Sequence, residues 1–376
     1  MKRLLAAVMA SAALCGAAQP LATPPIAARA FVLVDALSGQ TLAAAAENDR
    51  FEPASLTKLM TAYLAFGALR DGRLDMAKSI APSAAALKAP GARMFLEAGK
   101  PATVGELLQG LIVASGNDAA VALAEALAGS EEAFVARMNA EAARLALVNT
   151  RFVNASGAPA PGHQSSARDL ALLALALVRD FPGQYAFFSQ KELAYRGIKQ
   201  ANRNRLLWSD PSVDGLATGF TESAGFCILA SARRGERRLV AVVLGAQSEA
   251  LRTSESQKLL NFGFQAYETR RLYKAGDEVS SAEIFKGTQG RARLGFERDI
   301  FLTLPRDRFG GLNAVLETRR PFVAPLAAGE KAGIMKLMRD NAPVAEFTVV
   351  ALEEVPIAGF LSRGWDTLRL LFRTSP

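Results

Sequence analysis

The chain has 376 residues, of which 50% are hydrophobic and 21% are charged, a composition that excludes dominant disorder and allows two or three globular domains. Its 44 Lys and Arg residues outnumber its 36 Asp and Glu residues, and the net charge of +8 suits an anionic surface. One histidine and two cysteines are too few for a disulfide scaffold or a zinc site, and a Ser-His-Asp hydrolase would depend on His163 alone.

The N-terminal stretch has the layout of a secretory signal peptide. Lys2 and Arg3 precede an apolar stretch that ends near Leu14, and the small residues that follow predict cleavage after Ala18. The apolar stretch is too short to span a bilayer, and no run of about 18 apolar residues occurs later. We therefore predict a signal peptide over residues 1–18; an uncleaved anchor is the alternative.

The next part of the chain predicts a hairpin and then helices. Residues 31–45 are typical of a β-hairpin that turns at Ser38 and Gly39. From about residue 54 to residue 186, apolar residues recur three or four positions apart, as in amphipathic helices. Ser166 is a plausible N-cap for one of these helices.

Beyond residue 210 the pattern changes to strands. Two short apolar runs, at 225–232 and 238–246, predict adjacent buried strands, and residues 254–268 return to helical periodicity. We interpret residues 30–270 as one α+β domain, in which a sheet from both ends of the segment packs against a mostly helical middle.

The C-terminal third predicts two further parts. Strand-length apolar runs bounded by Gly, Pro or Asp indicate a small all-β domain over residues 271–355. Residues 356–376 predict an amphipathic helix that lies on a membrane surface, with arginines on its polar face. A helix docked on the protein's own core is the alternative. The apolar face consists of Ile357, Phe360, Leu361, Trp365, Leu368, Leu371 and Phe372.

Two short motifs in the helical part suggest chemistry. Ser55 and Lys58 stand at positions i and i+3 and share one helix face. An unprotonated lysine can take the serine's proton if burial or a nearby cation lowers the lysine pKa, but a lone motif of this kind is weak. Ser115 can pass a proton, and Asn117 can hold a substrate amide or orient the lysine.

A third motif, residues 214–221, directly precedes the predicted strands. Gly219 lets the backbone approach a substrate closely, and a strand edge here can align an extended peptide. The backbone N–H groups of Phe220 and Ser55 are candidates for an oxyanion hole.

The order and spacing of these motifs resemble those of the penicillin-recognising serine enzymes, whose signature is Ser-x-x-Lys, Ser-x-Asn and Lys-Thr-Gly. More narrowly, the chain is similar to low-molecular-mass penicillin-binding proteins of the D-alanyl-D-alanine carboxypeptidase type, from about Phe31 to Glu268 and in the layout of its C-terminal parts. The resemblance implies a β-lactamase/transpeptidase-like domain, an antiparallel sheet with flanking helices. The matching stretches are EPASLTKLMTAY, LLQGLIVASGNDAAVALAE, GSEEAFVARMNAEAARLAL, SSARDLALL, NRNRLLW, VDGLATGFTESAGF and KLLNFGF.

The resemblance also implies roles for individual residues. Ser55 is the acylated nucleophile, Lys58 its base, and Ser115 a catalytic residue of the second motif. An arginine that binds the substrate's terminal carboxylate corresponds to Arg252, because a guanidinium grips a carboxylate with paired hydrogen bonds. The expected substrate-binding residues are Asn117, Thr218, Gly219, Phe220 and Arg252.

The implied reaction removes the terminal D-Ala of a peptidoglycan stem peptide and needs no metal or cofactor. The expected partners are that peptide, β-lactam antibiotics as covalent inhibitors, and a membrane surface, but not nucleic acid, because no nucleic-acid module is visible. The resemblance implies a periplasmic protein attached to the outer face of the cytoplasmic membrane.

The third motif departs from the family at Ala217, where a lysine, or sometimes a histidine, is usual. Phe220 also replaces a residue that is often polar. The missing cation would help to hold the substrate carboxylate and to depress the pKa of Lys58. We therefore expect reduced or altered activity, with Arg252 or another cation such as Arg205 taking over part of the role.

Other functions stay open. Ala217 favours a non-catalytic peptidoglycan-binding or shape-maintaining homologue, and a D,D-endopeptidase would use the same residues. A β-lactamase is disfavoured because no convincing Glu-x-x-x-Asn element follows Ser115. Outside the motifs, we expect His163 to be a solvent-facing loop residue and Cys227 an inert buried thiol.

Overall fold

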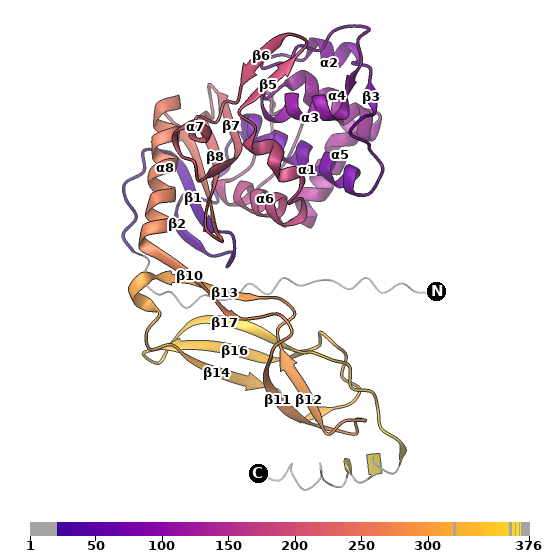
Figure 1. Ribbon diagram of the computed structural model, residues 1–376, viewed down its shortest axis with the longest axis vertical. Helices are drawn as coiled ribbons and strands as arrows, with labels where there is room; N and C mark the ends of the chain where they lie inside the picture. Colours follow the sequence, from indigo (N-terminus) through magenta and orange to yellow (C-terminus); the bar gives the residue numbers. More distant parts are fainter. Residues whose placement is uncertain (1–20, 319–320, 361–362, 365, 368, 370–376) are drawn as a thin grey trace. The chain divides into compact units, whose positions relative to one another are not determined.

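The computed structural model describes residues 21–318, 321–360, 363–364, 366–367 and 369. The chain divides into two compact units (Figure 1), the larger comprising Ala22–Tyr267 and the smaller containing Glu268–Pro376. The predicted signal peptide over residues 1–18 lies outside the described residues. Within the part that is described, no helix is both long enough and apolar enough to cross a membrane.

A five-stranded antiparallel sheet with the order β2-β1-β9-β8-β7 forms the frame of the larger unit. The predicted hairpin and the predicted adjacent strands are confirmed, and the pairing of β1 with β9 joins the two ends of the segment. Strand β7 lies at one edge. The strands are β1 (Ala30–Asp35), β2 (Thr41–Ala45), β7 (Val213–Thr221), β8 (Gly225–Arg234) and β9 (Arg237–Ala246).

Helices cover this sheet on both sides (Figure 1). Helix α8 (Glu249–Ala266) packs on one side and α6 (Ala167–Asp180) on the other. Strands buried on both faces need apolar residues at consecutive positions, which explains the unbroken apolar runs of β1, β8 and β9. Ser166 caps α6 as predicted, because its side chain accepts a hydrogen bond from the backbone N–H of Asp169.

The middle of the larger unit is helical, as the periodicity predicts. Two short hairpins interrupt it, β3 (Ser79–Ile80) with β4 (Ala102–Thr103) and β5 (Glu192–Tyr195) with β6 (Ile198–Ala201). Its remaining elements are η1 (Ala54–Thr57), α1 (Lys58–Arg70), α2 (Ala84–Lys88), α3 (Val104–Ile112), α4 (Asn117–Ala128), α5 (Glu131–Arg144), η2 (Gln184–Ser189) and α7 (Leu206–Ser209).

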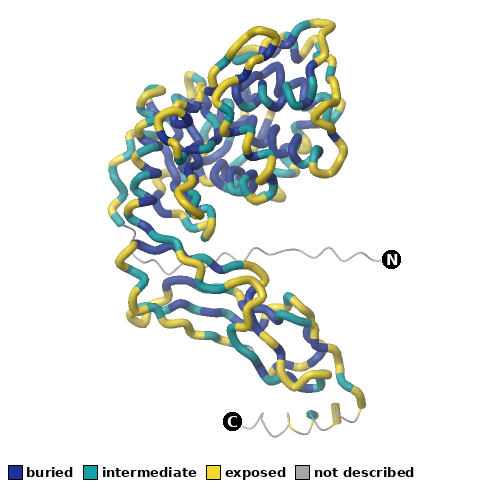
Figure 2. The backbone as a smooth tube through the Cα atoms, in the orientation of Figure 1, coloured by how far each residue is buried: buried dark blue, intermediate teal, exposed yellow. Residues whose placement is uncertain are grey.

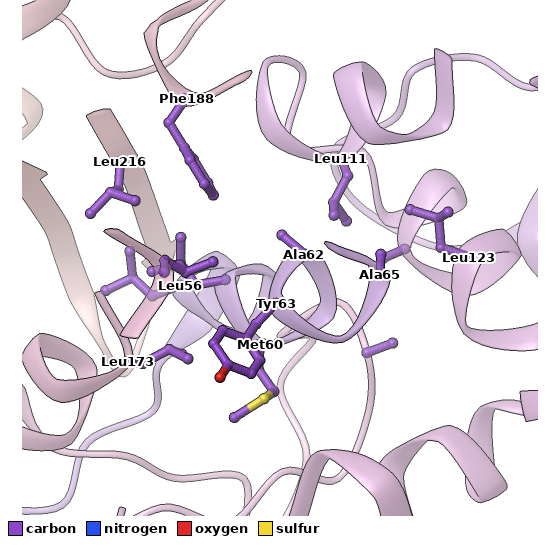
Figure 3. Packing of buried hydrophobic residues seen from close by; sticks show 14 of the residues in the cluster. Leu56, Met60, Ala62, Tyr63, Ala65, Leu111, Leu123, Leu173, Phe188 and Leu216 are labelled. Carbon is purple, nitrogen blue, oxygen red and sulfur yellow. The ribbon is translucent and has the colours of Figure 1, made fainter. Parts of the chain in front are cut away.

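Helix α1 lies at the centre of the larger unit's core. Nine of its thirteen residues are buried, and a helix that is apolar on most sides must be surrounded by protein. Side chains of η1 and α1, among them Leu56, Ala62 and Ala65, belong to one cluster with side chains from α3, α4, α6, η2 and β7 (Figure 3). This packing fixes the N-terminal end of α1, where the first motif lies.

Residues 268–355 of the smaller unit form a β domain, as predicted, with its own buried core (Figure 2). Its main sheet has the strand order β14-β16-β17-β12-β11-β15, and β10 pairs with β13. A short 3-10 turn, η3 (Arg306–Arg308), follows β13. The strands are β10 (Tyr267–Tyr273), β11 (Glu278–Phe285), β12 (Arg291–Gly295), β13 (Ile300–Pro305), β14 (Asn313–Thr318), β15 (Phe322–Val323), β16 (Lys331–Arg339) and β17 (Ala342–Ala351).

The predicted terminal helix is described only in part. Asp366 accepts a hydrogen bond from the backbone N–H of Lys286 at 2.6 Å, and the guanidinium of Arg369 lies 3.4 Å from the carboxylate of Glu283. Its polar side chains therefore contact the β domain, whereas Phe360 is 83% exposed. Several predicted apolar positions lie outside the described residues: Leu361, Trp365, Leu368, Leu371 and Phe372.

Candidate active site

Ser55 and Lys58 meet at the junction of η1 and α1. The Nζ atom of Lys58 lies 3.1 Å from Oγ of Ser55 and donates a second hydrogen bond, of 2.6 Å, to the carbonyl oxygen of Ser156. Lys58 is only 4% exposed. The i, i+3 spacing thus brings a potential nucleophile and a potential base into contact.

The surroundings of Lys58 favour its neutral form. Burial removes water from the ammonium group and, together with the charge of Arg203, lowers the lysine pKa from 10.5 to about 7, although the charge of Asp118 opposes the shift. About half of the Lys58 side chains are then neutral at neutral pH. Lys58 can therefore accept a proton from the hydroxyl of Ser55.

Sequence reasoning missed Ser156, which accepts a hydrogen bond from Lys58. Asn154 holds this loop, because its side-chain oxygen accepts hydrogen bonds from the backbone N–H groups of Ser156, Gly157 and Ala158 at 3.2, 2.7 and 3.1 Å. An asparagine that binds the backbone two to four residues later is a turn signal visible in the sequence. Because 98 residues separate Ser156 from Lys58 in the sequence, the contact between them could not be predicted from neighbouring residues.

Asp118 was also missed, although it directly follows the second motif. Its fully buried carboxylate accepts hydrogen bonds from the backbone N–H groups of Met94 and Phe95, both at 2.9 Å, and of Leu96 at 3.1 Å. Three such bonds satisfy a buried charge and fix the loop before α3 against the start of α4.

Ser115 and Asn117 lie at the N-terminal end of α4. Ser115 adopts the left-handed conformation (φ 56°) and is 8% exposed. The side-chain nitrogen of Asn117 donates a hydrogen bond to the carbonyl of Pro90 at 2.5 Å, whereas its side-chain oxygen has no partner among the residues described. That oxygen can therefore accept a hydrogen bond from a substrate amide.

The third motif lies on strand β7, against η1. A β-carbon on Gly219 would lie 3.0 Å from that of Ala54 and 3.2 Å from the backbone nitrogen of Ser55, so a side chain here would require η1 to shift by a few tenths of an ångström. Thr218 is 7% exposed, and the half-exposed ring of Phe220 lies 4.5 Å from that of Phe226. The edge of β7 thus lies directly beside the candidate nucleophile.

Arg252 reaches the same edge from α8. Its guanidinium donates a hydrogen bond to the carbonyl of Gly219 at 3.2 Å and lies 3.6 Å from Glu249, while its Nε atom has no partner in the described part of the chain. The side chain is 5% exposed, and desolvation lowers its pKa. A carboxylate in the cleft would compensate this buried charge.

Two adjoining cavities connect these groups. The larger, of about 420 Å³, is an open cleft lined by seven predicted residues, namely Ser55, Ser115, Asn117, Thr218, Gly219, Phe220 and Arg252. The smaller, of about 20 Å³, adds Lys58 and Ala217. The structure therefore brings all the predicted site residues together. No group of three or more His, Cys, Asp or Glu side chains that could hold a metal occurs among the described residues.

One expectation about the missing cation was wrong. The side chain of Arg205 is 61% exposed, lies 3.4 Å from the carboxylate of Glu249 and lines neither cavity. Arg203, two residues earlier, lines both. The two arginines follow the same kind of residue in an Asn-Arg-Asn-Arg run, so the sequence offers no means of telling them apart.

The expectation for His163 was also wrong, because this residue is only 3% exposed. Its Nδ1 atom accepts a hydrogen bond from the backbone N–H of Val153 at 3.0 Å, so Nε2 carries the proton and donates it to the hydroxyl of Thr57 at 2.7 Å. His163 lines neither cavity, and its hydrogen bond to Thr57 connects it to η1. Cys227 is buried, as predicted.

Burial of His163 should make the stability of the protein depend on pH. Desolvation lowers the pKa of this residue from 6.5 to about 4, so its contribution is complete above pH 6.5 and is lost as the pH falls towards 4. We expect the free energy of unfolding in urea to fall by up to about 3 kcal/mol across this interval. The variant His163→Gln should lack this component, and parallel pH curves for the two proteins would contradict the prediction.

Comparison with known proteins places this geometry in a family. The family described as D-alanyl-D-alanine carboxypeptidase matches residues 17–248, and the C-terminal domain of penicillin-binding protein 5 matches residues 267–356. The D-alanyl-D-alanine carboxypeptidase DacD of Salmonella typhimurium is 40% identical over 368 residues, 96% of this chain and 93% of that protein. DacC of Escherichia coli is 38% identical over 364 residues, 95% and 91% of the two chains.

Solved structures agree with the sequence matches. Penicillin-binding protein 5 of Haemophilus influenzae has a TM-score of 0.86 at 36% identity and covers 89% of this chain and 99% of its own. Penicillin-binding protein D2 of Listeria monocytogenes, in its ampicillin-bound form, has a TM-score of 0.57 at 30% identity and covers 65% and 100%. The family resemblance seen in the motifs is confirmed, and the chain belongs to the serine D-alanyl-D-alanine carboxypeptidases.

Proposed function

We propose that the protein trims the terminal D-Ala from peptidoglycan pentapeptides through an acyl-enzyme on Ser55. The main support is the 3.1 Å contact between the Ser55 hydroxyl and the buried amine of Lys58, whose pKa of about 7 lets it act as a base at neutral pH. Family membership supports the reaction class.

The proposed reaction has two steps. Lys58 takes the proton of Ser55, and Oγ attacks the carbonyl carbon between the two D-Ala residues, where the backbone N–H groups of Ser55 and Phe220 stabilise the oxyanion. The carbon–nitrogen bond then breaks, and Ser115 passes the proton held by Lys58 to the departing amine, which leaves Lys58 neutral. In the second step, neutral Lys58 takes a proton from water, and the oxygen of that water attacks the ester carbonyl. The bond to Oγ then breaks, Lys58 returns the proton to Oγ of Ser55, and the shortened peptide leaves as its carboxylic acid.

The cleft supports binding of an extended peptide along the edge of β7. Arg252 is proposed to pair with the terminal carboxylate, and the partnerless side-chain oxygen of Asn117 to accept a substrate amide N–H. A β-lactam would enter the same position and acylate Ser55. A likeness to an ampicillin-bound penicillin-binding protein supports this part of the proposal.

We propose further that the protein acts in the periplasm, on the outer face of the cytoplasmic membrane. The predicted signal peptide supports export. In the C-terminal segment, the contacts of Asp366 and Arg369 with the β domain leave Phe360 exposed, an orientation that suits contact with lipid. We propose residues 30–270, 271–355 and 356–376 as the peptidase, β and anchoring parts.

The direct test is incubation of the protein lacking residues 1–18 with a pentapeptide ending in D-Ala–D-Ala, followed by mass spectrometry. We expect release of one D-Ala and labelling by a fluorescent penicillin, both lost in Ser55→Ala. Cleavage of crosslinked dimers without release of D-Ala would instead identify an endopeptidase. Binding of peptidoglycan with neither label nor cleavage would identify the non-catalytic homologue that Ala217 favours.

A further inference from the structure

We propose that Arg203 supplies the positive charge that strand β7 lacks at Ala217, and that this charge keeps Lys58 competent as the base. The inference rests on the proposed function of Ser55 and Lys58. Arg203 would then be a positioning residue whose charge acts through Lys58. It lies in the loop between β6 and α7, not on strand β7.

Arg203 borders both cavities of the candidate active site. Arg203 lines the open cleft together with Ser55 and Thr218, and it lines the smaller cavity together with Lys58 and Ala217. At that cavity the side chain of Ala217 ends at its β-carbon, so β7 contributes no charge there. Arg203 thus borders both the nucleophile and the place where a strand lysine would begin.

The backbone on each side of Arg203 is fixed. Asn202 is 3% exposed and donates a side-chain hydrogen bond to the carbonyl of Gln190 at 2.9 Å. Asn204 is fully buried and donates one, of 3.1 Å, to the carbonyl of Gly215 on β7. The two asparagines are also joined, because the backbone N–H of Asn204 donates to the side-chain oxygen of Asn202 at 2.9 Å. Arg203 is therefore held at a set position relative to β7, although its own side chain is exposed.

The charge of Arg203 is not neutralised by a neighbour. Arg205 and Arg252 both lie beside the carboxylate of Glu249, at 3.4 and 3.6 Å. Arg203 forms no ion pair or hydrogen bond within the described ranges of the chain. An unpaired guanidinium bordering a partly enclosed cleft acts at longer range than one that a carboxylate screens.

Two charged side chains act on the protonation of Lys58 in opposite directions. Asp118 acts on Lys58 from α4 and favours the ammonium form, whereas Arg203 opposes it from the loop. The other groups that contact the amine are neutral, namely the hydroxyl of Ser55 and the carbonyl of Ser156. Arg93 lies 3.9 Å from the carboxylate of Asp118 and stays in place in either case. Removing Arg203 would take away a charge that disfavours the ammonium form, so that a larger share of Lys58 would be protonated at pH 7.

The experiment measures the second-order rate constant for labelling by a fluorescent penicillin between pH 6 and 10, with the protein lacking residues 1–18. We expect Arg203→Gln to move the midpoint of the profile up by about one pH unit, which lowers labelling at pH 7 about fivefold and leaves labelling at pH 10 near that of the wild type. Arg205→Gln is the matched control and should leave the profile unchanged. Ala217→Lys should restore the wild-type midpoint in the Arg203→Gln protein.

The outcomes separate this inference from the proposed function. Absence of labelling in the wild type at every pH would overturn both. Labelling of the wild type with a superimposable profile for Arg203→Gln would overturn the role of Arg203 alone, and so would an equal loss at every pH, which would indicate a purely structural or carboxylate-binding role. An unchanged midpoint on adding Ala217→Lys would show that the two positions do not share one function.

Discussion

Replacing Lys58 with arginine is expected to lower acylation of Ser55 at least about a thousandfold, although the positive charge beside the hydroxyl is kept. A guanidinium does not lose its proton in proteins, so arginine cannot act as a base. The variant therefore separates a lysine that serves as a base from one that serves only as a cation. Labelling with a fluorescent penicillin at pH 7 to 10 gives the measurement.

A control is needed because Lys58 is 4% exposed and arginine is larger. Lys58→Met fills a similar volume without a charge and should be equally inactive while retaining cooperative unfolding. Labelling of either variant at a rate near that of the wild type would contradict the assignment of Lys58 as base. Loss of cooperative unfolding in both would indicate instead that the amine holds the loop at Ser156.

Replacing Gly157 with alanine is expected to destabilise the protein by about 4 kcal/mol. Gly157 adopts φ 84°, and an added β-carbon would lie 1.8 Å from the carbonyl oxygen of Ala54, far inside contact distance. The loop must then move away from η1 and take with it the carbonyl of Ser156 that binds Lys58. Penicillin labelling should fall together with the free energy of unfolding in urea.

The matched control for this variant is Gly129→Ala. Gly129 ends α4 with the same φ of 84°, but an added β-carbon there meets nothing within 4 Å. This variant should cost only the strain of alanine in the left-handed region, about 1 to 2 kcal/mol, and should keep its labelling rate. Equal losses of stability in the two variants would show that backbone strain alone, and not the contact with Ala54, makes glycine necessary at position 157.

Local patterns in the sequence predicted much of this molecule. The hairpin at 31–45, the buried strands and the contact of Ser55 with Lys58 all depend on spacings of two to four residues, which periodicity reveals. Ser115, Thr218 and Arg252 are far apart in the sequence but line one cleft. Their spacing did not predict this arrangement, whereas the family resemblance did.

Other features depended on contacts that no local pattern encodes. Ser156 meets Lys58 across 98 residues and His163 meets Thr57 across 106, so neither burial nor role could be predicted from neighbouring residues. Arg203 and Arg205 differ only in which of them reaches the cleft as the chain passes β7. Between them, the buried side chain of Asn204 donates a hydrogen bond to the carbonyl of Gly215, a tertiary contact that no local pattern reveals.

The enclosure of Ala54 by Gly157 and Gly219 has a consequence for drug resistance. Both glycines approach the peptide between Ala54 and Ser55 with backbone alone, so a β-carbon at either position would press on the peptide that carries the N–H of Ser55. An antibiotic and the natural peptide would draw on this same donor. A substitution at Gly157 or Gly219 that weakened acylation by a β-lactam would therefore be expected to weaken turnover of the natural peptide as well.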